Sequence, residues 1–152
     1  AEKVWPLFER MDKCYDIEKD YIITLNGDLS YMPEGMNITP EGENYREQYK
    51  IYYSPENRNA VKESMKAIKD EFASKGSKMY YRVYNSGFGA DAEFFLVSIA
   101  AKDEVDMATK GKANQDLMGD DGQKVMFNMF QNIRSIEEIE GMMRPDVGIS
   151  QN

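Results

Sequence analysis

The stretch 79–101, MYYRVYNSGFGADAEFFLVSIAA, decides the fold because it holds two β-rich runs on either side of a glycine-bearing loop. The run 79–85 is rich in Tyr and Val, and the run 93–100 is nearly continuous Phe, Leu, Val and Ile. The residues between them, 86–91, are typical of a turn rather than of a phosphate-binding loop, because no helix follows them. The stretch therefore predicts a β-hairpin, which needs further strands and helices to be stable.

The chain on either side of the hairpin extends it into an α+β domain. Apolar and polar residues alternate over 45–54 and predict a strand. Ser54-Pro55 then favours the start of a helix, and Gly76 favours its end. After the hairpin we expect a helix from Asp103 that breaks at Gly119 and restarts at Asp120.

A weak strand over 135–143 completes the series. The order from Tyr45 onward is thus βαββαβ, which is typical of a ferredoxin-like antiparallel sheet with helices on one face.

The N-terminal part of the chain predicts a helix and a strand of its own. Apolar residues at steps of three and four indicate an amphipathic helix over 2–14, and we expect Trp5 to lie in a core. Alternation over 16–25 predicts a strand, and the glycine- and proline-bearing stretch 28–44 predicts a long surface connection.

The first helix and strand resemble the last ones. Val4, Leu7, Phe8 and Met11 match four apolar residues that each lie 122 positions further on. We therefore predict three parts: a segment, 1–31, that resembles the end of a preceding repeat; a linker, 32–44; and a ferredoxin-like domain, 45–152.

Composition narrows the classes of function. The chain has 152 residues, a formal net charge of −8 and a pI of about 4.7, which argues against nucleic acid as a partner. No apolar run approaches the roughly 20 residues that span a bilayer, so we expect a soluble protein, cytoplasmic or periplasmic, without a membrane partner. The sequence lacks histidine and has one cysteine, Cys14, so it predicts no metal site, no cofactor and no histidine-dependent nucleophile.

Four motifs carry a resemblance to a known superfamily: YYRVY at 80–84, SGFG at 86–89, FFLV at 94–97 and MRPD at 143–146. Together they resemble uncharacterised bacterial proteins of the dimeric α/β-barrel superfamily, related to NIPSNAP and antibiotic-biosynthesis monooxygenase domains. The resemblance implies that two such units, from a homodimer or from a second repeat N-terminal to this one, pack their sheets face to face around a small-molecule site.

Alternate residues of the strands should face opposite sides of the sheet. The more apolar set should pack against the helices: Tyr49, Ile51, Tyr53, Tyr81, Val83, Phe95, Val97 and Ile99. The other set mixes aromatic rings with polar groups and supplies our candidate ligand-binding residues: Gln48, Lys50, Tyr52, Tyr80, Arg82, Tyr84, Ser98 and Glu138. Within it, we expect Arg82 to bind a carboxylate and Glu138 to balance its charge.

The sequence identifies no catalytic residues, and three functions remain. The first is a non-catalytic small-molecule-binding or interaction domain. The second is a cofactor-independent monooxygenase or isomerase that acts on an aromatic or polyketide-like compound. The third is a purely structural module within a longer chain. For the polar set itself, the alternative to a pocket is a subunit interface without a ligand.

Overall fold

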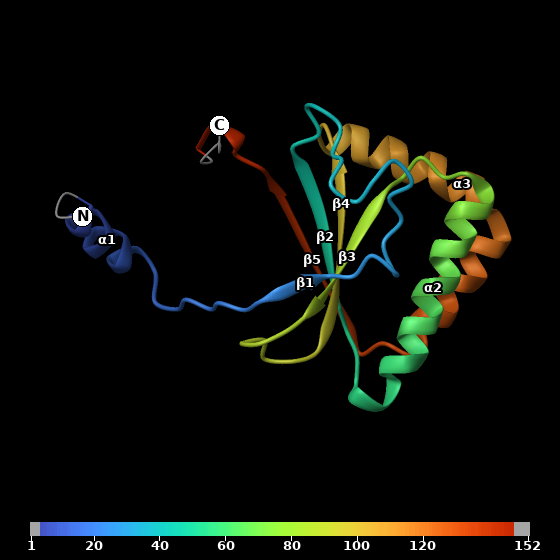
Figure 1. The fold of residues 1–152 in the computed structure, drawn as a ribbon, viewed down its shortest axis with the longest axis horizontal. Helices are drawn as coiled ribbons and strands as arrows, with labels where there is room; N and C mark the ends of the chain where they lie inside the picture. Colours follow the sequence, from blue (N-terminus) through green and yellow to red (C-terminus); the bar gives the residue numbers. More distant parts are fainter. Residues whose placement is uncertain (1–3, 148–152) are drawn as a thin grey trace.

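The computed structural model describes residues 4–147 and has an α+β architecture. One five-stranded antiparallel sheet carries two long helices on one face (Figure 1). The strands are β1 Ile23–Leu25, β2 Tyr45–Tyr52, β3 Tyr81–Ser86, β4 Phe94–Ala101 and β5 Ser135–Met142. The helices are α1 Trp5–Met11, α2 Arg58–Lys75 and α3 Glu104–Phe130, with short 3₁₀ turns at Asp12–Cys14, Pro55–Asn57 and Pro145–Val147.

The strands lie in the order β1-β3-β4-β2-β5, and every neighbouring pair is antiparallel. From β2 onward the element order is strand, helix, strand, strand, helix, strand, as the sequence predicts. β1 adds a fifth strand at the edge beside β3. The hairpin is confirmed as β3 and β4, and its turn brings Gly89 so close to the N-terminal segment that a Cβ there would lie 2.6 Å from the backbone oxygen of Asp20.

Glycines end or break the helices where the sequence predicts. Gly76 has the left-handed φ of 63° that allows it to close α2. Gly119 has φ 56° and ψ −149° inside α3, a conformation available essentially to glycine alone. The residue divides α3 into two helical runs, and Asp103 Oδ1 caps the first of them by accepting a hydrogen bond from the backbone NH of Asp106 at 2.8 Å.

The core lies between the sheet and the two long helices. The two helices contribute four buried side chains to this core: Val61, Met65 and Ile68 of α2, and Met129 of α3. The predicted helix-facing set is confirmed, because all eight of its members belong to this cluster or pack against it: Tyr49, Ile51, Tyr53, Tyr81, Val83, Phe95, Val97 and Ile99.

The N-terminal segment departs from expectation in three places. The predicted strand is confirmed only over Ile23–Leu25. The placement of Trp5 in a core is wrong, because its side chain is 69% exposed on a helix that stands apart from the sheet (Figure 1). The stretch 28–44 does not lie wholly on the surface: Leu29 is fully buried in the core, and the buried Ser30 Oγ accepts a hydrogen bond from the backbone NH of Val83 at 2.8 Å.

Candidate functional site

The candidate ligand-binding residues lie mainly on the sheet face that α2 and α3 leave open. Antiparallel partners share a face, and the pairs Gln48–Ser98 and Arg82–Ser98 therefore place these three side chains together on the open face. Gln48 Nε2 lies 3.4 Å from Ser98 Oγ. Tyr84 lies opposite Leu25 of β1 on the same side.

Lys50 is largely enclosed although it lies on this open face. Only 13% of its side chain is exposed, and its Nζ lies 5.2 Å from the ring centroid of Tyr21 and 5.7 Å from that of Phe94. Tyr52 donates a hydrogen bond to Glu137 Oε2 at 2.9 Å, and the same oxygen lies 3.6 Å from Lys50 Nζ.

The environment of Lys50 keeps it protonated. Burial by itself lowers the pKa of Lys50, but the adjacent Tyr21 hydroxyl and the charge of Glu137 outweigh burial and raise the pKa above its ordinary value. Lys50 is therefore a fixed cation beside a carboxylate, and it does not have the lowered pKa of a lysine nucleophile or base.

Arg82 has a structural partner in place of the expected carboxylate ligand. Its guanidinium donates hydrogen bonds to the backbone oxygens of Met36 and Ile38, each at 2.8 Å, and to Thr39 Oγ1 at 3.2 Å. Tyr80 likewise donates to Glu34 Oε1 at 3.1 Å. These contacts hold the stretch 34–39 against the sheet.

The placement of Glu138 on this face is wrong. Glu138 lies opposite Tyr49 in the β2–β5 ladder and therefore shares the helix-side face, whereas Glu137 lies opposite Lys50. Glu137 and Glu138 are consecutive residues of β5 and point to opposite faces of the sheet. The sequence of β5 alone does not show which of them points to the open face. The register of the ladder decides it.

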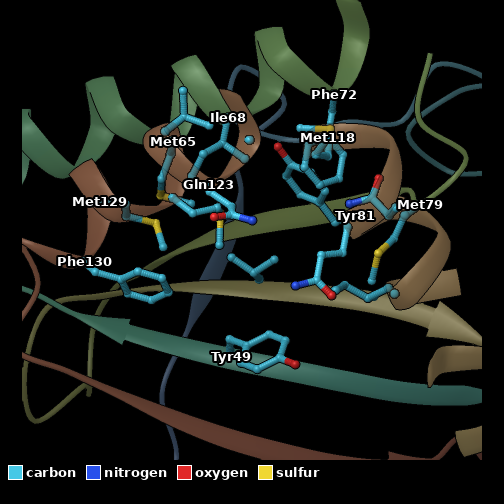
Figure 2. Close-up of a pocket in the computed structure, with 18 of the residues that line it drawn as sticks. Tyr49, Met65, Ile68, Phe72, Met79, Tyr81, Met118, Gln123, Met129 and Phe130 are labelled. Atoms are coloured by element: carbon cyan, nitrogen blue, oxygen red, sulfur yellow. The ribbon is translucent and has the colours of Figure 1, made fainter. Parts of the chain in front are cut away.

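The two faces differ greatly in the space they offer. On the open face, Tyr80, Arg82 and Ser98 line a hollow of about 30 Å³, which is the volume of a single water molecule. A cavity of about 540 Å³ lies on the other face, between the sheet and the helices (Figure 2). None of the eight predicted residues lines this larger cavity.

Three glycines of α3 line this cavity. Gly111, Gly119 and Gly122 all line the cavity from the helix that forms its roof. At Gly111 a Cβ would meet no atom within 4 Å, whereas at Gly122 it would lie 2.4 Å from the Cβ of Met118. Gly111 therefore leaves space, and Gly122 permits the close turn that follows the break at Gly119.

The cavity wall is largely apolar and rich in methionine. Five methionines contribute, and thioethers adapt to irregular shapes better than branched side chains do: Met65, Met79, Met118, Met126 and Met129. Figure 2 shows several of them pointing into the space between α2, α3 and the sheet, opposite Tyr49. Phe130 and Ile136 also line the cavity and are 48% and 40% exposed, so it opens to solvent beside β5.

A few neutral polar groups interrupt the apolar wall. They are the amides of Asn114, Gln115 and Gln123 and the phenols of Tyr49 and Tyr81. Asn114 Oδ1 already accepts a hydrogen bond from Ser77 Oγ at 2.5 Å. Among the described residues that line the cavity there is no Asp, Glu, Lys or Arg.

Tyr81 is the most deeply buried of these polar residues. Its hydroxyl is sealed from solvent without a hydrogen-bond partner, and its ring packs edge-on against Phe72 with 5.3 Å between centroids. Burial is the main cause that raises the pKa of Tyr81, so the group remains a neutral phenol.

A sequence signal for this cavity exists, although it is a faint one. Gly111, Gly119 and Gly122 occur with Met118 and Met126 along one side of a helix of low hydrophobicity. Small residues on the inward side of a helix leave a gap unless a facing side chain fills it. Such a pattern contains no reactive residue type and does not identify a ligand.

Searches for known sites and relatives add no assignment. Within residues 4–147 no group of three or more His, Cys, Asp or Glu side chains is arranged to hold a metal ion. Over the same residues no helix has the length and apolar character needed to cross a membrane. The chain matches no protein-family model, no curated protein and no solved structure.

Proposed function

We propose that this protein is a ferredoxin-like domain that binds an uncharged, largely apolar small molecule in the cavity between its sheet and its helices. The single observation that carries the proposal is the cavity of about 540 Å³, which falls within the range of about 300–1,000 Å³ that is usual for small-molecule sites. The strand order β5-β2-β4-β3 supports the ferredoxin-like assignment, with β1 as an addition at the edge.

The uncharged wall determines the class of ligand. A charged ligand would lose its hydration on entry and would find no side chain of opposite charge among the described residues of the wall. The amides of Gln115 and Gln123 can donate or accept one or two hydrogen bonds, so they suit a carbonyl, ether or hydroxyl group on an otherwise apolar molecule.

The same wall favours binding over catalysis. Its titratable side chains are Tyr49 and Tyr81, and the pKa of Tyr81 is raised by burial. General acid–base catalysis needs a group that exchanges protons near the working pH. The cofactor-independent monooxygenase or isomerase therefore has less support than a binding protein, and the kinship with dimeric α/β-barrel proteins and the face-to-face pairing of two sheets stay predictions.

Fluorescence titration with two dyes of different charge tests the proposal. We expect the neutral dye Nile red to bind the purified protein with a blue-shifted emission and to compete with other neutral apolar compounds. The anionic dye 8-anilinonaphthalene-1-sulfonate should bind at least tenfold more weakly. A preference for the anionic dye, or no binding of Nile red, would contradict the proposal.

A matched pair of variants locates the bound dye. Gly111→Met puts a side chain into the empty part of the cavity, and Ala113→Met puts the same side chain on the exposed outer side of α3. We expect Gly111→Met to weaken Nile red binding at least tenfold while it keeps or raises thermal stability. Ala113→Met should leave binding unchanged. Equal affinities in both variants would place the dye elsewhere and overturn the site.

A further inference from the structure

Asn114 is a polar residue of the cavity wall whose orientation is fixed by a buried neighbour. Its Oδ1 accepts a hydrogen bond from Ser77 Oγ at 2.5 Å, and Ser77 Oγ in turn accepts one from the backbone NH of Met79 at 3.1 Å. A serine hydroxyl has a single hydrogen, and only 2% of Ser77 is exposed, so a reversed amide would leave that hydrogen buried without an acceptor. The oxygen of Asn114 is therefore occupied, and its two N–H groups remain for another partner.

Ser77 is itself held firmly in place just after the end of α2. It follows Gly76, which closes the helix, and its backbone NH donates a hydrogen bond to the backbone oxygen of Phe72 at 2.9 Å. Its backbone oxygen accepts a hydrogen bond from the hydroxyl of Tyr31 at 3.1 Å. Segments that are far apart in the sequence thus set the direction of one amide on α3. An amide that is oriented beforehand loses little freedom when it binds a ligand.

The empty part of the cavity lies beside this amide. Gly111 precedes Asn114 by three residues in a helical run, so the two positions are neighbours on one side of α3, and both line the cavity. A Cβ at Gly111 would meet no atom within 4 Å. A ligand that fills this space therefore comes within reach of the N–H groups of Asn114. Figure 2 shows Met79, which is bonded to Ser77, at the end of the cavity away from Phe130.

The other polar groups of the wall are less selective. Gln115 and Gln123 are exposed, so water can replace a partner and either end of each amide can turn toward a ligand. The hydroxyl of Tyr81 is a donor, but the side chains around it cover it completely. Asn114 is therefore the residue best placed to distinguish a hydrogen-bond acceptor from a donor.

We propose that the ligand of this cavity carries a ketone or ester carbonyl, and that Asn114 Nδ2 donates a hydrogen bond to the carbonyl oxygen at the Gly111 end. This inference rests on the proposed function, because it specifies the polar group of the neutral apolar molecule assigned to the cavity. The apolar body of the ligand extends toward the mouth at Phe130. An alcohol fits less well, because its own O–H finds the oxygen of Asn114 already occupied.

Three neutral naphthalene compounds of similar shape test this preference. 2-acetylnaphthalene has a carbonyl oxygen, 1-(2-naphthyl)ethanol has a hydroxyl group, and 2-ethylnaphthalene has neither. Displacement of Nile red measures the affinity of each compound for the full chain. In the wild-type protein, the ketone should bind about fivefold more tightly than the alcohol, which is the effect of one neutral hydrogen bond.

A matched pair of leucine variants shows whether Asn114 causes the preference. Asn114→Leu should weaken binding of the ketone about fivefold relative to the hydrocarbon and should abolish the advantage of the ketone over the alcohol. Asn128→Leu makes the same change at an exposed position of α3 outside the cavity wall and should alter neither ratio. Both measures are ratios within one variant, so a change in overall stability does not affect them.

Infrared spectroscopy of the bound ketone gives a readout that needs no variant of Asn114. Accepting a hydrogen bond weakens a carbonyl bond, so the isotope-labelled carbonyl of 2-acetylnaphthalene should absorb at lower frequency in the wild-type protein than in hexane. Tyr81→Phe should leave the band in place. Asn114→Leu should move it toward its position in hexane.

Two results would overturn this inference and leave the proposed function standing. One is an equal loss of affinity for the ketone and the hydrocarbon in Asn114→Leu. The other is a carbonyl band that moves in Tyr81→Phe and stays in place in Asn114→Leu. Failure of all three compounds to displace Nile red would overturn the inference together with the proposed function.

Discussion

Lys50 of β2 and Glu137 of β5 face each other across the open side of the sheet, with Lys50 Nζ 3.6 Å from Glu137 Oε2. The neighbouring Glu138 points to the other side of the same strand, where it meets Glu47 and Glu140. Two adjacent glutamates thus stand in opposite electrostatic environments, one beside a cation and one beside like charges.

This difference predicts opposite effects for the same substitution at the two positions. Glu137→Gln should lower the free energy of unfolding by about 1 kcal/mol, because it leaves the enclosed Lys50 without its counter-charge. Glu138→Gln should leave stability unchanged or raise it slightly. Urea unfolding at pH 7 measures both, and equal effects would contradict the register of β2 and β5.

The pH dependence of stability should report Glu47. Because burial and like charges raise the pKa of Glu47, its ionised form is disfavoured in the folded state at neutral pH. This penalty is present above the raised pKa and is lost as the pH falls through it toward the unfolded value. Glu47→Gln should therefore stabilise the protein by less than about 1 kcal/mol at pH 7, and the gain should vanish at low pH. A gain that is the same at both pH values would contradict the assignment.

Two glycines of α3 should respond in opposite directions to alanine. Gly119→Ala should lower the free energy of unfolding by about 1–3 kcal/mol, because alanine is strained at φ 56° and ψ −149°. Gly111→Ala should raise it by up to about 1 kcal/mol, because Gly111 is helical and the added methyl group meets open space. Thermal unfolding of the two variants measures the difference, and a destabilised Gly111→Ala protein would argue against the empty volume at that position.

The side chain of Arg82 should hold the stretch 34–39 against the sheet. Arg82→Met removes the hydrogen bonds to the backbone oxygens of Met36 and Ile38, and we expect a loss of about 1.5–3 kcal/mol. Limited proteolysis followed by mass spectrometry should then show faster cleavage within that stretch. Gln48→Met on the same open face serves as the control and should keep the wild-type cleavage pattern.

Local sequence patterns were sufficient to predict the main elements. Glycine and proline positions marked the start of the helix after Ser54 and the break at Gly119, and alternation identified which residues of β2, β3 and β4 face the helices. These features depend on neighbours within a few residues, and such neighbours are visible in one sequence.

The remaining features depend on contacts between distant segments. The register of β5 against β2 decides the positions of Glu137 and Glu138, and no local pattern contains it. Arginine is a residue type that often binds ligands, yet the guanidinium of Arg82 donates its hydrogen bonds to backbone oxygens more than 40 residues away in the sequence. The cavity escaped prediction for a different reason, because it depends on side chains that are absent at Gly111, Gly119 and Gly122.

The three glycines of α3 differ in whether they can be replaced without disturbing the fold. Gly119 is required by its backbone conformation and Gly122 by the nearby Cβ of Met118, so replacing either residue would disturb the helix. Gly111 is under no such constraint, because a Cβ there would meet no atom within 4 Å. The position would therefore accept side chains of different sizes. The residue at position 111 would therefore set the size of the ligand that fits in the cavity. A substitution there would leave the sheet, the break at Gly119 and the rest of the cavity wall unchanged.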